Sequence, residues 1–154
     1  MLKASKIYKV IGLMSGTSLD GLDIAYCHFE HINNSWSFSI METQDIAYDL
    51  EYKKRLKNSI ALNTPNLLTF HNEYGSWLGK KVKEFINTHK LDVDFISSHG
   101  HTVFHQPKIG LTYQIGSGQH LANECGKQVI CDFRTNDVAS VSYTHLTLPT
   151  TSRV

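Results

Sequence analysis

The 154-residue sequence contains no run of 18 or more apolar residues, so nothing in it predicts a membrane-spanning helix. Its first residues lack the long apolar region and the small-residue cleavage site of a signal peptide. A charge excess is also missing, with 15 Lys and Arg against 14 Asp and Glu. Binding to nucleic acid driven by bulk charge is therefore not expected, and neither is binding to a membrane.

The sequence has few cysteines, and their spacing does not suggest pairs. Cys27, Cys125 and Cys131 form an odd set with no Cys-x-x-Cys spacing. This argues against a disulfide framework or a zinc finger and favours a reducing cytoplasm as the compartment. Cys131 lies in an apolar segment, so we expect it in the core. Seven Phe, seven Tyr and two Trp exclude disorder of the whole chain and are enough for one core.

The hydrophobic pattern predicts three strands, followed by helices and strands in alternation. Strands are expected at 6–15, 22–31, 36–47, 91–98, 112–115 and 128–133, and helices at 49–61, 64–89 and 119–125. Thr64 and Pro65 resemble an N-cap and first helical residue. The fold class is therefore α/β, a mixed sheet with helices packed on it, and no linker divides residues 1–139.

The final segment, residues 140–154, differs from the rest in composition. It is rich in Thr and Ser, carries one charge and has no helical period. Residues 141–150 resemble the translation of a sequencing-library adaptor, so we expect a non-native tail. A natural, loosely ordered tail is the alternative.

A glycine-rich motif spans residues 12–23, Gly-Leu-Met-Ser-Gly-Thr-Ser-Leu-Asp-Gly-Leu-Asp. Glycines let backbone amides approach phosphate oxygens, and hydroxyls add donors. A Walker A loop is excluded, because no Lys follows and the next segment reads as a strand. The motif is similar to the phosphate hairpin of actin- and hexokinase-like enzymes, with Asp20 a candidate to hold a metal-bound water. A tight hairpin without a ligand is the alternative.

Three histidines lie within seven residues, at His99, His101 and His105. On a strand, His99 and His101 would point the same way, which suggests a zinc site. No carboxylate is adjacent, however, and Gly100 interrupts the pair. A strand end whose His and Thr side chains bind a sugar hydroxyl is as plausible, and hydrogen-bonded structural histidines are a further alternative.

Two further motifs suggest anion binding. Gly116-Ser-Gly118 opens a predicted helix whose amides could hold an anion, but the third glycine of a dinucleotide motif is missing. Arg134 follows a strand, near Asp132 and Asp137. Arg134 could bind a ligand carboxylate, or form a structural ion pair with either aspartate.

Together these motifs resemble the anhydro-N-acetylmuramic acid kinase family over residues 7–139. The resemblance rests on four segments in order: residues 12–23, residues 98–107 (Ser-His-Gly-His-Thr with His-Gln-Pro), residues 112–116 (Thr-Tyr-Gln-Ile-Gly) and residues 132–134 (Asp-Phe-Arg). His101 is a departure, because the family more often has Gln there. Both side chains can hydrogen-bond a hydroxyl group.

The resemblance implies an actin/hexokinase-like (ribonuclease H-like) fold, of which residues 1–139 would be the N-terminal lobe. It implies a cytoplasmic kinase of peptidoglycan recycling, which uses MgATP and water to open 1,6-anhydro-N-acetylmuramic acid and phosphorylate its O6. ATP would be bound by Gly16, Thr17, Ser18, Leu19, Asp20, Gly21, Leu22 and Asp23. The sugar would be bound by His99, Gly100, His101, Thr102 and Arg134, and Arg134 is our candidate for its lactyl carboxylate.

The resemblance also implies that parts are missing. The family is more than twice as long, and its catalytic base is an Asp in an Asp-Thr-Gly-Pro-like motif that would lie downstream of residue 139. We therefore expect an inactive fragment of a kinase that forms a homodimer at full length, with no resident metal ligands here. The alternatives are a non-catalytic module that binds sugar or phosphate, and a zinc-dependent hydrolase that uses His99, His101 and His105.

Overall fold

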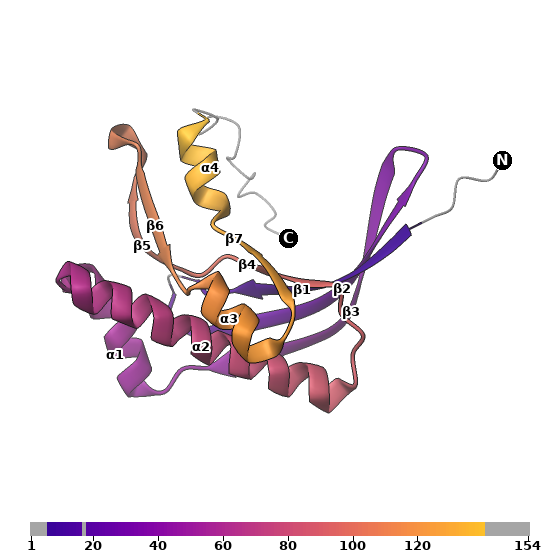
Figure 1. The fold of residues 1–154 in the computed structure, drawn as a ribbon, viewed down its shortest axis with the longest axis horizontal. Helices are drawn as coiled ribbons and strands as arrows, with labels where there is room; N and C mark the ends of the chain where they lie inside the picture. The colour runs from indigo at the N-terminus through magenta and orange to yellow at the C-terminus, as the bar shows by residue number, and fades with distance from the viewer. Residues whose placement is uncertain (1–5, 17, 141–154) are drawn as a thin grey trace, which may run out of the picture.

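The computed structural model describes residues 6–16 and 18–140. Its largest element is a five-stranded mixed sheet in the order β3-β2-β1-β4-β7 (Figure 1). These strands are β1 (Lys6–Met14), β2 (Gly21–Ile32), β3 (Ser35–Ala47), β4 (Phe95–Ser98) and β7 (Gln128–Cys131). The first three strands pair antiparallel, whereas β4 is parallel to β1 and β7 is parallel to β4. The predicted mixed sheet and its opening antiparallel meander are confirmed.

Three helices lie on one side of this sheet (Figure 1). They are α1 (Leu50–Asn58), which runs into a short 3-10 helix η1 (Ser59–Ala61), α2 (Thr64–His89) and α3 (Gly118–Cys125). The Asn63 side chain caps α2 by accepting a hydrogen bond from the Asn66 amide at 3.0 Å. The prediction that Thr64 is the N-cap was therefore wrong by one residue, because Thr64 is already helical.

The core lies between α2 and the sheet. The apolar side chains predicted at every third or fourth position of α2 are buried, as the sequence pattern indicated: Leu67, Phe70, Tyr74, Leu78, Val82 and Phe85. They belong to one cluster with Ile11, Leu13, Leu22, Ile24 and Ile96 of the sheet. Burial of these side chains is the main favourable contribution to this fold.

Two elements were missed by the sequence analysis. One is β5 (His101–Gln106), which pairs antiparallel with β6 (Leu111–Ile115) across a short 3-10 helix η2 (Pro107–Ile109). The other is α4 (Phe133–Ala139), which begins at a residue assigned to a strand. Its Thr, Asn, Asp and Val residues are weak helix formers, so local propensity gave no signal.

Smaller corrections concern the strand ends. β4 begins at Phe95, so residues 91–94 are not part of it. Cys131 is exposed at the edge strand β7 and does not belong to the core, contrary to the prediction. Ser140 ends α4, and the rest of the predicted non-native tail lies outside the described residues. Among residues 6–16 and 18–140, no helix has the length and apolar character needed to cross a bilayer.

Candidate functional site

The glycine-rich turn lies at the carboxyl end of β1. Because β4 runs parallel to β1, the residues that follow β4 reach the same end of the sheet. The amide of His99 donates to the carbonyl of Leu13 at 3.2 Å, which holds the histidine-containing segment beside the turn. Carboxyl ends of neighbouring parallel strands are the usual place for ligands in α/β sheets. The fold thus brings two of the predicted motifs together.

A buried cluster of three hydroxyl groups anchors the start of the turn. Ser15, Tyr48 and Tyr74 form a closed triangle, with oxygen–oxygen distances of 2.9, 2.7 and 2.7 Å. All three residues are buried, Tyr74 completely. Burial is also the main cause that raises the pKa of Tyr48 and, further, that of Tyr74, so both phenols stay protonated. The triangle ties the turn to α2 and to the end of β3.

The turn itself presents polar groups to solvent. Ser18, Asp20 and Asp23 are exposed, and the amide of Leu19 donates to the carbonyl of Gly16 at 3.3 Å. Leu19 has a φ of 58°, which a tight reversal requires and which is uncommon for a non-glycine residue. Thr17, also predicted to bind phosphate, lies outside the described residues.

Two of the predicted ATP-binding residues have clear structural roles. Leu22 is fully buried in the core, so only its backbone could contact a nucleotide. A Cβ atom on Gly21 would lie 2.4 Å from the Ile46 carbonyl oxygen on β3. Glycine is therefore needed there for the pairing of β2 with β3, whether or not a ligand binds. A substitution at Gly21 would test the fold rather than nucleotide binding.

A hollow of about 330 Å³ joins the turn to the histidine segment. Its lining includes Asp23, Asp45, Ser97, His99 and Phe133. Asp23 and Asp45 are direct cross-strand partners on β2 and β3, and like charges in this arrangement repel. A cation between a ligand and these carboxylates would relieve that repulsion. Asp45 and Phe133 were not predicted as site residues.

His99 and His101 do not share a strand face as the zinc interpretation required. Gly100 turns the chain between β4 and β5 with a φ of 71°, a conformation that favours glycine. The Nδ1 atom of His99 lies 3.0 Å from the carbonyl of Gly100. His101, the first residue of β5, is 5% exposed. Its burial, and to a lesser degree the nearby His99, lower its pKa, so the neutral ring is favoured.

Several polar atoms near this turn are buried without a hydrogen-bond partner among the described residues. They are Oγ of Ser98, Nδ1 of His101 and Oε1 of Gln114. Gln114 also donates through Nε2 to Thr102 at 3.4 Å, which places Thr102 in the same polar region. An unsatisfied buried polar group costs about 1–3 kcal/mol.

The third histidine, His105, lies further along β5 in the β5–β6 hairpin. Nδ1 of His105 lies 3.3 Å from the hydroxyl of Thr112 on β6. Over the described ranges, no group of three or more His, Cys, Asp or Glu side chains has the geometry to hold a metal ion. The structure thus does not assemble the zinc site that His99, His101 and His105 could have formed.

Arg134 lies in the first turn of α4, directly after Phe133 of the hollow. Its Nη1 atom is 3.7 Å from Oδ2 of the buried Asp137, and that oxygen accepts no hydrogen bond from the described residues. Asp132 instead accepts from the Thr135 hydroxyl at 2.6 Å. The ion pair of Arg134 with Asp137 is loose, which leaves the guanidinium group donors for a ligand carboxylate.

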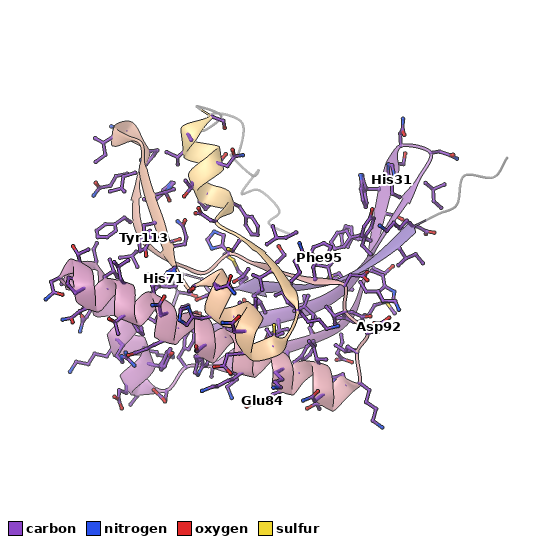
Figure 2. The ribbon with its side chains drawn as sticks, in the orientation of Figure 1. His31, His71, Glu84, Asp92, Phe95 and Tyr113 are labelled. Atoms are coloured by element: carbon purple, nitrogen blue, oxygen red, sulfur yellow. The ribbon has the colours of Figure 1, made fainter. Side chains whose placement is uncertain are left out.

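The second anion-binding candidate, Gly116-Ser117-Gly118, is already satisfied internally. The Ser117 hydroxyl accepts from the His120 amide as the N-cap of α3. The Gly116 amide donates to Nδ1 of His71 at 3.2 Å, and the His71 ring stacks on Tyr113 (Figure 2). The Gly116 amide, the Ser117 hydroxyl and the His120 amide therefore already have partners within the described part of the chain.

Comparison with known proteins agrees with these motifs. A sequence model of the family described as anhydro-N-acetylmuramic acid kinase matches residues 8–143. This chain belongs to the anhydro-N-acetylmuramic acid kinase family. The resemblance drawn from the four motifs is thus confirmed over most of the chain.

Curated relatives named anhydro-N-acetylmuramic acid kinase support the assignment. The protein from Pseudoalteromonas translucida is 33% identical over an alignment of 153 positions, which covers 90% of this chain and 38% of the relative. The protein from Pseudoalteromonas atlantica is 36% identical over an alignment of 145 positions, which covers 85% of this chain and 36% of the relative. A Bacillus cereus protein is 32% identical, and the alignment covers 85% of this chain and 37% of the length of that relative. The chain spans little more than a third of the length of these relatives.

Sequence reasoning found the turn and the histidine segment but missed their supports. Tyr48 and Tyr74 lie far from the turn in sequence, and only the fold brings their hydroxyl groups to Ser15. Asp45 could have been found from the alternation of β3, once its register with β2 was known. Phe133 had been assigned to a strand, which concealed its position at the hollow.

We expect Tyr74→Phe to lower the free energy of unfolding by about 1–3 kcal/mol, because the Ser15 and Tyr48 hydroxyls each lose a buried partner. Amide hydrogen exchange at Gly16 should also become faster. Tyr52→Phe is the matched control, since Tyr52 stacks on Tyr48 but its hydroxyl is outside the triangle. Urea denaturation of the 154-residue chain measures both variants. Equal effects of the two substitutions would show that the triangle does not anchor the turn.

The buried His101 and the half-buried His71 are expected to reduce the stability of the fold in acid. Burial lowers the pKa of His101 and of His71 in the folded chain. The unfolded chain, with a histidine pKa of about 6.5, therefore binds protons more readily as the pH falls through that value. Unfolding free energy should decrease from pH 7.5 to 5, by at most about 1.4 kcal/mol per pH unit for each histidine. His101→Gln should make this slope shallower. A slope unchanged by the substitution would contradict the assignment.

Proposed function

We propose that this chain is the nucleotide- and sugar-binding part of an ATP-dependent kinase of peptidoglycan recycling. The reaction is the conversion of 1,6-anhydro-N-acetylmuramic acid and water to N-acetylmuramic acid 6-phosphate in the bacterial cytoplasm. The observation that carries the proposal is the meeting of the glycine-rich turn and the His99 segment at one end of β1 and β4. The sheet order is compatible with one lobe of an actin/hexokinase-like fold.

The turn has the features that a phosphate site needs. Its exposed Ser18 hydroxyl and the backbone amides of the reversal are donors for phosphate oxygens. The hydroxyl triangle below Ser15 holds the turn in place before a nucleotide arrives, which reduces the ordering cost of binding. Phosphoryl transfer depends mainly on such positioning and on charge stabilisation.

The carboxylates beside the turn fit Mg²⁺. This ion usually binds one or two protein carboxylates together with substrate phosphates and waters. Asp20 and Asp23 belong to the motif, and Asp45 faces Asp23 across the sheet. In this proposal one or two of these carboxylates would hold the magnesium of MgATP together with its phosphates, and the ion would help to neutralise charge on the transferred phosphate.

The polar region behind His99 fits a sugar. Ser98, His101 and Gln114 each hold a buried polar atom without a partner among the described residues, and Thr102 and His99 lie next to them. The half-buried side chains of His99 and Thr102 can pair with sugar hydroxyl groups directly, and the three buried atoms can do so once the side chains that cover them move. Arg134 supplies the positive charge for the lactyl carboxylate, and a planar guanidinium group can bind it through two parallel hydrogen bonds.

The proposal assigns no catalytic base to the described residues. Deprotonation of the attacking water requires a carboxylate within hydrogen-bond distance of it, and by resemblance that Asp belongs to a segment beyond residue 139. The 154-residue chain should therefore not turn over by itself. Full-length members would complete the ATP cleft with a second lobe, and by the same resemblance form a homodimer.

A chimera tests the function. Residues 6–139 would replace the matched part of the Pseudoalteromonas translucida relative, and ATP-dependent formation of the 6-phosphate would be measured. We expect turnover from the chimera and none from the 154-residue chain. A folded chimera that binds neither ATP nor the anhydro sugar would contradict the proposal. Turnover by the short chain, in proportion to its concentration, would contradict its assignment as incomplete.

Arg134→Ala in the same chimera tests the sugar end. Loss of a charge-assisted hydrogen bond worth about 1.5–3 kcal/mol should raise the KM for the sugar about 10- to 100-fold. The KM for ATP should change less than about twofold, which is within the scatter of such a measurement. Arg55→Ala is the control, because Arg55 pairs with Glu73 on the helical side of the sheet. An equal increase in the KM for the sugar and in the KM for ATP would rule out Arg134 as the carboxylate ligand.

A further inference from the structure

One face of the sheet is packed against helices, and the other is largely bare. Figure 1 shows α1, α2 and α3 on the first side, whereas the β5–β6 hairpin and α4 rise from the other side near one edge. Figure 2 shows Phe95 of β4 on the side away from α2. The alternation of β1, β2 and β3 directs a second set of large apolar side chains to this bare face.

These side chains are exposed to an unusual degree. Three large apolar residues occupy alternate positions of β3, on the same face: Trp36, Phe38 and Ile40. They are 62%, 66% and 59% exposed. Their partners across β2 are His31, Phe29 and Cys27. The Phe29 and Phe38 rings lie 6.1 Å apart, and Trp36 stacks on His31 at 4.6 Å. A contiguous apolar patch of this kind marks a surface that another polypeptide or ligand covers.

The middle of the bare face is a groove of about 420 Å³. Its walls are almost entirely apolar and include Tyr8, Val10, Phe29, Trp36 and Phe95. Small residues form its floor: Gly12, Cys27 and Ser97. The groove can therefore accept large apolar side chains, but it offers few hydrogen-bond partners to a polar molecule such as a sugar or nucleotide.

Gly12 adds an independent indication. It lies inside β1, where glycine weakens a strand. A Cβ atom on Gly12 would have the Ala25 carbonyl oxygen at 3.9 Å as its nearest contact, which is ordinary packing. Nothing within the described residues therefore requires glycine at this position. A glycine inside a strand often marks the close approach of another backbone, and Gly12 faces the groove.

The length of the relatives indicates what covers the face. This chain matches only 36–38% of the three curated relatives described above, so each has well over half its length elsewhere. A sheet that is apolar on both faces needs a layer on both faces. We propose that the bare face, defined by Tyr8, Gly12, Cys27, Phe29, Trp36, Phe38, Ile40 and Phe95, is the docking surface for an apolar, close-packed element of that remaining polypeptide.

The native cysteines provide a readout that does not depend on activity. Cys27 lines the groove, whereas Cys125 lies on α3, on the opposite side of the sheet. Thiol labelling, without nucleotide or sugar, is compared between the 154-residue chain and the chimera with the Pseudoalteromonas remainder. We expect Cys27 to be labelled at least about tenfold more slowly in the chimera and Cys125 to change little, because protection scales with local opening.

Two variants locate the contact. Phe38→Asp in the chimera should restore fast labelling of Cys27, because a carboxylate cannot be buried there without a large cost. Ile109→Asp is the matched control, since Ile109 is 71% exposed but lies in η2 at the tip of the β5–β6 hairpin. Gly12→Val should leave the 154-residue chain as stable or more stable, and should expose Cys27 in the chimera.

Three results would overturn the proposal. The first is equal labelling of Cys27 in the chimera and the short chain, which would mean that the face stays open. The second is an equal change in the labelling rate of Cys27 in the chimera for Phe38→Asp and for Ile109→Asp. The third is a dimer of the 154-residue chain that Phe38→Asp dissociates in sedimentation, with Cys27 protected in that dimer, which would assign the face to a second copy. None of these outcomes depends on whether the chimera has kinase activity.

Discussion

The position of β1 in the sheet is the constraint on which the rest of the structure depends. β1 pairs antiparallel with β2 on one side and parallel with β4 on the other. The first pairing makes the glycine-rich segment a hairpin turn, and the second brings the segment after β4 to the same end. Ile11 and Leu13 of β1 are buried against α2, so the same strand carries the core and fixes the site.

Much of this architecture could be predicted because its signals are local. The 3.6-residue period of α2 and the turns between the first three strands depend only on neighbouring residues. β5 and α4 were missed because tertiary contacts, rather than a local sequence pattern, determine where these two elements form. His101 and His105 give β5 a polar pattern, and α4 begins after Asp132, which has a φ of 63°. Such a start has no sequence signature.

In the candidate site, too, some residues could be identified from local sequence and others only from the fold. The residues proposed to face a ligand lie in short motifs, so the turn and the His99 segment could be identified directly from the sequence. The residues that support them do not. Tyr74 lies 59 positions from Ser15, and its hydrogen bond to that residue exists only because α2 crosses the end of β1. Conversely, Gly21 and Leu22 belong to the motif but have structural roles, since one permits the pairing with β3 and the other fills the core.

The hollow beside His99 and the apolar groove lie on the same face of the sheet, and Gly12 and Ser97 border both. A polypeptide layer that covers the groove would therefore reach the edge of the hollow, where it would form a wall of the candidate site. Water would be excluded from the hollow by that layer rather than by the residues described here. Exclusion of water strengthens electrostatic interactions with phosphate and carboxylate groups. If the proposed layer covers the bare face, the same layer also completes the candidate site, because β1 carries the glycine-rich turn and borders the groove.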